Sequence, residues 1–404
     1  MSRSPRVTVV TSRLDVGGTE HHLTRVLPAL QRRGVDITLY LMERGGQLES
    51  GLAAQGVRIE GPARSSFLHW PRAMLQLASF LRHEQPDVIH FFLPRPYVYG
   101  SLAAELAGHR RRIMSRRSLT HYQTSYPLLG NLERMLHRRT LGTIGNSKAV
   151  VEQLLSETGD RRKVALIHNG IELSEPVAAA ERQRIREALQ IPNEALVIAI
   201  VANLVAYKGH RDLLAALALA KEELPQPWRL VAVGRDDGVG AALKQQAQAL
   251  DLSGNISWLG ERSDVGRLLA ASDVFALPSH QEGFSNALLE AMAASLPVIA
   301  TAVGGNIDAV SDNDTGLLVH AKDPKGLAAA ISRLAKDPML RRRLGDAARL
   351  RVERRFSLNV CVERYEKLYR AVIEAAAPPI GEILTDACGG HARELNAGII
   401  EHAS

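Results

Sequence analysis

Cysteine, aromatic residues and long apolar runs are scarce in this sequence, and each scarcity narrows the class of protein. Cys361 and Cys388 are the only cysteines among 404 residues, so we expect neither a disulfide framework nor a cysteine-rich metal site. No apolar run approaches the length that crosses a membrane, and the run at residues 7–10 is too short for a signal peptide. We therefore expect a cytoplasmic protein that at most lies on a membrane surface.

The length and composition favour two domains. A chain of 404 residues is too long for one ordinary hydrophobic core. Only 4% of the residues are aromatic, whereas Ala, Leu and Arg are abundant, which is typical of a helix-rich α/β protein.

Positive charge is concentrated in the first half of the chain. Residues 1–175 hold 24 Lys and Arg against 15 Asp and Glu, a net charge of +9, whereas the remainder has a net charge of −2. This asymmetry indicates a surface that meets acidic lipid headgroups, a lipid-linked phosphate or nucleic acid. A scatter of solvated arginines is the alternative. Nucleic acid is disfavoured because the basic residues lack interleaved aromatics and any known binding module.

The most informative stretch is LPSHQEGFSNALLEAMAA, residues 277–294. An apolar strand ends at Leu277, a polar loop follows, and apolar residues then recur at helical spacing from about residue 286. Glu282 in the loop and Glu290 in the helix have the spacing to share one site beside the carboxyl end of a parallel strand. The helix start suits a phosphate, so the stretch predicts a site for a sugar phosphate. Two solvated carboxylates are the alternative.

This stretch resembles the donor-binding signature of the retaining glycosyltransferase family 4, the glycogen-synthase-like group. The resemblance is nearly residue for residue over 258–310 and weaker from Val7 to about Tyr369. It implies a GT-B fold, an α/β architecture of two Rossmann-like domains whose parallel sheets face each other across a cleft. The implied acceptor-side domain spans 1–175, the donor-binding domain 176–355, and a helix at 356–377 returns to the first domain, leaving residues 378–404 unassigned.

The beginning of the chain reads as strand, glycine turn, helix and strand, a Rossmann-like opening. Apolar strands are expected at 7–11 and 35–42, with a helix from about Glu20 to Arg33 between them. Gly17-Gly18 lacks the spacing of a dinucleotide fingerprint and is either a plain tight turn or a close approach of backbone to ligand. The resemblance implies that this turn faces the donor diphosphate and the acceptor.

Several arginines flank a short strand at 113–115. We expect Arg110–Arg112, Arg116–Arg117 and Arg138–Arg139 either to bind an acceptor phosphate or anionic lipid, or to form a solvated face. The segment 118–127 lacks periodicity and predicts a loop that contains His121. The resemblance implies a residue of this loop near the sugar. His90 lies within an apolar strand and is expected to be buried rather than catalytic.

Lys208 is the main candidate in the second half. It follows a predicted strand at 195–201 and precedes a helix, where a cation reaches a phosphate, although a solvated lysine is the alternative. The resemblance implies that Lys208 binds the diphosphate. Many relatives have arginine where this chain has Asn203, so charge stabilisation rests more heavily on Lys208. Gly234 ends another strand in a flexible turn, where the resemblance implies that the nucleotide packs. Asp312-Asn313-Asp314 precedes a strand and is expected to be a turn, so no metal and no other cofactor is predicted.

The resulting hypothesis is a retaining glycosyltransferase that moves a sugar from a UDP- or GDP-sugar to a hydroxyl acceptor, either lipid-linked or a polysaccharide. An epimerase of the same fold and a non-catalytic binder of nucleotide sugars, to which Asn203 alone points, are the alternatives. The predicted catalytic residues are Lys208, Glu282 and His121. The predicted donor-binding residues are Gly17, Gly18, Asn203, Lys208, Gly234, Glu282, Gly283, Phe284, Ser285, Asn286 and Glu290.

Overall fold

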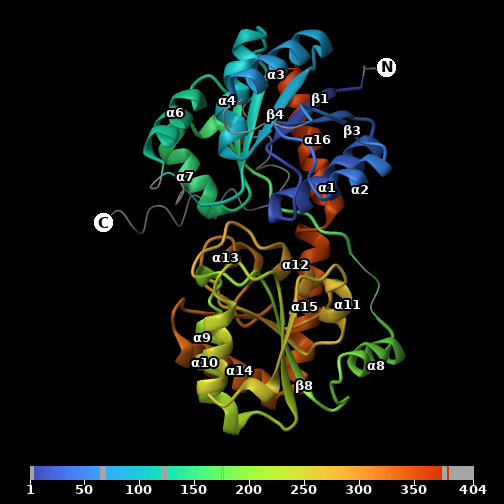
Figure 1. Ribbon diagram of the computed structural model, residues 1–404, viewed down its shortest axis with the longest axis vertical. Helices are drawn as coiled ribbons and strands as arrows, with labels where there is room; N and C mark the ends of the chain where they lie inside the picture. Colours follow the sequence, from blue (N-terminus) through green and yellow to red (C-terminus); the bar gives the residue numbers. More distant parts are fainter. Residues whose placement is uncertain are drawn as a thin grey trace. The chain divides into compact units, whose positions relative to one another are not determined.

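The computed structural model describes residues 4–63, 70–119, 123, 126–173, 175, 177–374 and 380–381. Their contacts divide the chain into two units, and each unit is built around its own parallel sheet (Figure 1). Unit 1 contains Met1–Gly170 and Leu358–Ser404, and unit 2 contains Ile171–Ser357. The boundaries expected from the sequence were 175 and 355. His121 lies outside the described residues.

The sheet of unit 1 has seven described strands, all parallel, in the order β3-β2-β1-β4-β5-β6-β7. Runs of Val, Ile, Leu and Phe form its central strands because both sheet faces are covered by helices. The strands are β1 Arg6–Thr11, β2 Asp36–Leu41, β3 Arg58–Glu60, β4 Val88–Phe92, β5 Arg112–Arg116, β6 Gly142–Gly145 and β7 Val164–Leu166.

The connecting helices of unit 1 include two that the sequence pattern did not predict, α4 and α6. Helix α4 begins at a proline, which tolerates the first helical turn, and has buried residues such as Tyr97, Ser101 and Ala104 around much of its circumference. Such a helix shows no clear polar face. The elements are α1 Gly18–Arg32, α2 Glu49–Ala54, α3 Trp70–Glu84, α4 Pro94–Leu106, α6 Pro127–His137, α7 Lys148–Thr158 and the 3-10 turn η2 Arg161–Lys163.

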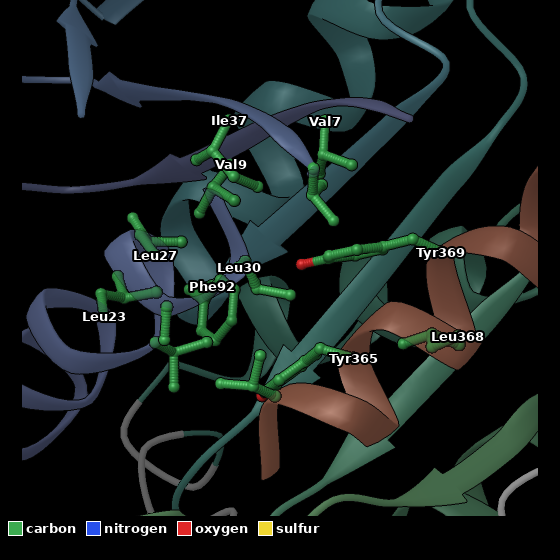
Figure 2. Packing of buried hydrophobic residues seen from close by; sticks show 14 of the residues in the cluster. Val7, Val9, Leu23, Leu27, Leu30, Ile37, Phe92, Tyr365, Leu368 and Tyr369 are labelled. Atoms are coloured by element: carbon green, nitrogen blue, oxygen red, sulfur yellow. The ribbon is translucent and has the colours of Figure 1, made fainter. Parts of the chain in front are cut away.

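Helix α16, Leu358–Glu374, belongs to unit 1 although it follows all of unit 2 in sequence. It packs against α1, and Figure 2 shows Tyr365 and Tyr369 of α16 within the apolar cluster that contains Leu30 and Phe92. Each fully buried side chain of this size contributes about 1.5–3 kcal/mol through removal of apolar surface from water. The predicted return of a C-terminal helix to the first domain is therefore confirmed, and its proposed end at 375–377 lies outside the described residues.

The six described strands of unit 2, β10-β9-β8-β11-β12-β13, repeat the order of the first six strands of unit 1, and all are again parallel. Its strands are β8 Leu196–Val201, β9 Trp228–Val233, β10 Ile256–Gly260, β11 Val274–Leu277, β12 Val298–Thr301 and β13 Leu317–Val319. Its helical elements are α8 Ala179–Ala188, η3 Ala206–Lys208, α9 His210–Ala220, η4 Lys221–Glu223, α10 Gly240–Ala249, η5 Ser253–Asn255, α11 Val265–Ala270, α12 Asn286–Ala293, α13 Asn306–Ala309, α14 Pro324–Lys336 and α15 Pro338–Arg355.

The strand order reverses between β1 and β4 in unit 1 and between β8 and β11 in unit 2. Such a reversal sends the loops after the two central strands to opposite sides and leaves a crevice at their carboxyl ends, where ligands bind in open α/β sheets. In unit 2 the loops at this position are 202–209 and 278–285. Both are stretches that the sequence predicted to bind the donor.

Candidate active site

Lys208 and Glu282 meet at the strand reversal of unit 2. Lys208 Nζ lies 2.7 Å from Glu282 Oε1, and their side chains are 19% and 7% exposed. Ser279 Oγ donates a hydrogen bond to the same carboxylate oxygen at 2.7 Å. Glu282 is therefore a buried, paired carboxylate, and the alternative of a solvated loop residue is wrong.

Two glycines bring the site loops close together. Gly209 has φ +73°, and a Cβ there would lie 1.9 Å from the carbonyl oxygen of Pro278. Gly304 has φ +48°, and a Cβ there would lie 1.8 Å from the carbonyl oxygen of Glu282. Left-handed backbone and such short approaches require glycine. The loop that carries Glu282 is thus held between the start of α9 and the turn after β12.

The segment from Gly283 to Asn286 forms the start of α12. Ser285 is the N-cap, and its Oγ accepts a hydrogen bond from Leu288 N at 3.3 Å. The ring of Phe284 is buried and lies 5.4 Å from that of Phe356. Glu290 lies in the second turn of α12 and is half-buried. The predicted strand, loop and helix are confirmed as local structure.

Asn203 contacts the loop after β9. Its Oδ1 accepts from Arg235 N at 3.3 Å, and its Nδ2 donates to Asp237 Oδ2 at 3.0 Å. Gly234 has φ +153°, and a Cβ there would lie 2.1 Å from the carbonyl oxygen of Ala202. The ends of β8 and β9 therefore approach each other through Gly234. Sequence reasoning missed Arg235 and Asp237, although both follow the glycine that it selected.

Two further contacts fix the approach of the Lys208 loop to the Glu282 loop. His280 N donates to the carbonyl oxygen of Tyr207 at 2.7 Å, and His280 Nε2 lies 2.7 Å from Asp212 Oδ2. The Lys208 ammonium lies 5.4 Å from the centre of the Tyr207 ring, within the range of a cation–π interaction. Burial, together with the positive charge of Lys208, lowers the pKa of His210 to about 4. No motif in the sequence indicated these partners.

In unit 1, Gly17 and Gly18 form the start of α1, with Gly17 as the N-cap in extended conformation. A Cβ on Gly17 would meet only the carboxyl end of the flexible Glu20 side chain, which can move aside, so this contact does not by itself require glycine. Burial raises the pKa of the Glu20 carboxyl.

His90 is fully buried, with its ring nitrogens 2.9 Å from Tyr369 Oη and 2.8 Å from Ser115 Oγ. The prediction of a buried rather than a catalytic His90 agrees with this position.

Not all of the clustered arginines can bind an outside anion. Arg116 is buried and forms ion pairs at 2.6 Å with both Glu133 and Glu157. Arg112 is likewise buried and lies 2.6 Å from Glu105. Both expectations for the arginines, an anion site and a solvated face, are therefore wrong for Arg112 and Arg116, because their charges are compensated inside unit 1. The exposed members are Arg110, Arg111, Arg138 and Arg139.

Comparison with known families identifies the chain. A sequence profile described as "Glycosyl transferases group 1" matches residues 181–351, and one described as "Glycosyltransferase Family 4" matches residues 16–175. The chain belongs to the group 1 glycosyltransferases. This glycosyltransferase is 28% identical to a D-inositol 3-phosphate glycosyltransferase of Corynebacterium diphtheriae, over 88% of this chain and 90% of that protein.

Two further proteins resemble this glycosyltransferase. The capsular polysaccharide biosynthesis glycosyltransferase CapM of Staphylococcus aureus is 25% identical over 75% of this chain and 81% of CapM. The crystal structure of Anabaena Alr3699/HepE in complex with UDP superposes with a TM-score of 0.80 at 20% identity, covering 89% of this chain and 98% of that one. The second likeness confirms the predicted GT-B fold with its two Rossmann-like domains.

In the part of the glycosyltransferase that the structure describes, no helix has the length and apolar character of a membrane span. Asp312-Asn313-Asp314 lies in a turn before β13, in which Asp312 Oδ1 accepts from Leu318 N at 2.9 Å. The expectation of a turn there is confirmed. The expectation that the enzyme uses no metal stays a prediction.

Proposed function

We propose that this glycosyltransferase moves a hexosyl group from a UDP- or GDP-sugar to a hydroxyl group of a lipid-linked or polysaccharide acceptor, with retention at the anomeric carbon. The observation that carries the proposal is the Lys208–Glu282 pair at the strand reversal of unit 2, beside the start of α12. Alr3699/HepE, which shares the fold, binds UDP.

Lys208 is proposed to bind and stabilise the donor diphosphate. An ammonium group has three N–H donors, so Lys208 retains further donors while it contacts Glu282. The positive end of the α12 dipole, at Asn286 and the Ser285 cap, adds a second favourable field for phosphate oxygens. Gly283 supplies a backbone without a side chain at the same turn, and Asn203 and Gly234 line the neighbouring strand ends.

Glu282 is proposed to accept hydrogen bonds from hydroxyl groups of the transferred sugar, and Glu290 from the ribose. Carboxylates suit this role because each oxygen accepts more than one hydrogen bond. Phe284 keeps the loop in place through its buried ring. As the family resemblance implies, the Gly17-Gly18 turn is proposed to face the donor diphosphate and the acceptor, and His121 is proposed to lie near the sugar.

The proposed reaction needs no covalent intermediate with the protein. The bond between the anomeric carbon and the diphosphate oxygen breaks, and its electron pair stays on the diphosphate. The acceptor hydroxyl oxygen bonds to the same face of the carbon, and its proton passes to a diphosphate oxygen. Stabilising the leaving negative charge is the main electrostatic requirement, to which a fixed cation and helix-end N–H groups contribute.

An anionic membrane is the proposed location of the acceptor, on its cytoplasmic side. Three neighbouring strands of unit 1, β5, β6 and β7, are each preceded by basic residues, and Lys163 Nζ donates to the carbonyl oxygen of Arg138 at 3.1 Å. We call this set the basic edge; it consists of Arg110, Arg111, Arg138, Arg139, Arg161, Arg162 and Lys163. Basic residues near anionic lipid contribute about 1 kcal/mol each.

Screening with nucleoside diphosphates tests the proposal. Purified full-length protein is titrated with UDP and GDP, and the matching nucleotide sugars are then incubated with and without membrane extract. We expect one diphosphate to raise the melting temperature and its sugar to be transferred, with the anomeric configuration retained by NMR. Binding of neither diphosphate would refute the proposal. Conversion of the donor alone to its epimer would establish the epimerase instead, and binding without turnover in any extract would establish a non-catalytic binder.

A further inference from the structure

The Lys208–Glu282 pair leaves a charge deficit at the proposed diphosphate site. The ammonium lies 2.7 Å from a carboxylate, so the pair as a whole carries no net charge. A departing nucleoside diphosphate gains negative charge, and dipoles alone compensate it less well than a second cation. This reasoning rests on the proposed function. A second cation at the carboxyl ends of the unit 2 strands would offset this deficit.

Arg235 is a cation in the loop after β9, the strand next to β8. It directly follows Gly234 at the end of β9, and β9 pairs with β8 along its whole length. Arg235 N donates to Asn203 Oδ1 at 3.3 Å, and its carbonyl oxygen accepts from Leu204 N at 2.8 Å. These bonds attach the backbone of Arg235 to the segment that leads into Lys208.

The guanidinium of Arg235 forms an exposed ion pair with Asp237, and such a pair is easily broken. Arg235 Nε lies 2.7 Å from Asp237 Oδ1, and the side chain remains 48% exposed. Asp237 also accepts from Asn203 Nδ2 at 3.0 Å. An exposed ion pair of this kind contributes little to stability. A diphosphate offers more oxygen acceptors than one carboxylate, and two of them can bind the guanidinium in a bidentate manner.

We propose that Arg235 is a further catalytic residue, which leaves Asp237 on donor binding and contacts the diphosphate. Asn203 positions the backbone of Arg235 for this contact. When the bond from the anomeric carbon to the diphosphate oxygen breaks, the electron pair stays on that oxygen, and Lys208 and Arg235 share its charge. The chain thereby carries its second cation in the loop after β9 rather than at position 203.

Arg262 provides a matched control for this proposal. It follows β10, one strand further from β8, and binds Asp264 two residues later at 2.8 and 2.7 Å, as Arg235 binds Asp237. Its side chain is 40% exposed. Arg262→Ala therefore removes the same charge and the same type of ion pair without touching the proposed site.

The test is calorimetric titration of UDP, GDP, uridine and guanosine into full-length wild type, Arg235→Ala and Arg262→Ala, with Lys208→Ala as reference. We expect Arg235→Ala to weaken diphosphate binding about tenfold, to leave nucleoside binding unchanged and to lower kcat with the cognate donor. Adding Asn203→Arg to Arg235→Ala should recover part of the affinity, because a guanidinium returns on the adjacent strand end.

Equal diphosphate affinity in Arg235→Ala and Arg262→Ala, while Lys208→Ala is weakened, would overturn the role of Arg235 and leave the proposed function standing. Failure of the wild type to bind either diphosphate would overturn both. Both arginines are exposed, so their variants are expected to fold, and unchanged melting temperatures confirm it.

Discussion

Lys208 Nζ and Glu282 Oε1 lie 2.7 Å apart, although the two residues follow different strands of the unit 2 sheet. Both side chains are largely buried, so each charge depends on the other for compensation. A buried pair of this kind is a poor source of stability, because desolvation of the two ions offsets their attraction. Its presence at the strand reversal is better explained by ligand binding than by folding.

The first prediction concerns this pair. Lys208→Met keeps the length of the side chain and removes its charge. We expect kcat to fall about 10²–10³-fold, the magnitude found when one donor to a developing anion is removed. Because Glu282 then lies buried without a cation, the free energy of unfolding should also fall, by up to about 3 kcal/mol. Steady-state kinetics and urea unfolding measure the two effects.

A double variant separates the two effects. In Lys208→Met/Glu282→Gln neither ion remains, so stability should return most of the way to that of the wild type, whereas activity should stay low. The coupling between the two sites is expected at about 1–3 kcal/mol. If Lys208→Met turns over the donor at the wild-type rate, Lys208 has no part in the chemistry.

The second prediction concerns Gly209. Alanine at φ +73°, with its Cβ 1.9 Å from the carbonyl oxygen of Pro278, would displace the Lys208 loop from the Glu282 loop. We expect Gly209→Ala to lower the free energy of unfolding by about 1–3 kcal/mol and to raise the KM for the donor. Thermal melting and donor titration provide the measurements.

Gly266→Ala is the control for Gly209→Ala. Gly266 lies in α11, and a Cβ there would have no neighbouring atom within 4 Å, so alanine should be neutral or stabilise by up to about 1 kcal/mol. An unchanged melting temperature and KM in Gly209→Ala would show that the close approach to Pro278 is not required.

The local parts of the site were predictable from sequence. Residues 277–294 contain the end of an apolar strand, a polar loop and an apolar helical repeat, and each signal acts over a few residues. The placement of Lys208 after one strand and Glu282 after another also followed from the pattern. Their direct ion pair did not, because sequence order does not reveal which loops touch at a strand reversal.

The unpredicted features depend on contacts between distant segments. Arg116 is one of several arginines in a basic stretch, and only the folded chain shows that it is buried between Glu133 and Glu157. Arg235 follows a glycine already selected as a turn, yet its link to Asn203 arises from strand pairing. Helix α4 was missed because it is buried on more than one side and therefore has no apolar period.

The third prediction concerns pH and His90. Burial is the main reason that the pKa of His90 is lowered to about 3, and Arg117 contributes. In the unfolded chain His90 is protonated below about pH 6.5, whereas in the folded chain it is protonated only below about pH 3. The free energy of unfolding therefore rises with pH across this interval. The contribution is complete above pH 6.5 and is lost by up to about 1.4 kcal/mol per pH unit as the pH falls.

Urea unfolding between pH 7 and pH 4 measures this dependence. Replacing the imidazole in His90→Gln should flatten the pH slope, at the cost of lower stability at pH 7 because the bonds to Tyr369 and Ser115 change. His83→Gln, on the exposed side of α3, should leave the slope as in the wild type. Equal slopes in wild type and His90→Gln would contradict the assignment.

The last prediction concerns the basic edge. Replacing four of its exposed arginines with serine removes four positive charges from the starts of neighbouring strands. Each charge contributes about 1 kcal/mol to binding of anionic lipid, so binding to vesicles with anionic lipid should weaken at least a hundredfold. Turnover of the donor with a soluble acceptor should not change, because these residues precede the strands and the site follows them. Vesicle co-sedimentation at two salt concentrations measures the effect. The replaced residues are Arg110, Arg138, Arg139 and Arg162.

A control variant with the same change of charge distinguishes the basic edge from net charge alone. Replacing four exposed arginines of α15 with serine removes as much positive charge from unit 2. If both variants lose vesicle binding equally, attraction depends only on overall charge, which salt screens over about 10 Å at 0.1 M. Selective loss with the first variant would instead locate the membrane contact at the amino ends of β5, β6 and β7. The control residues are Arg342, Arg343, Arg354 and Arg355.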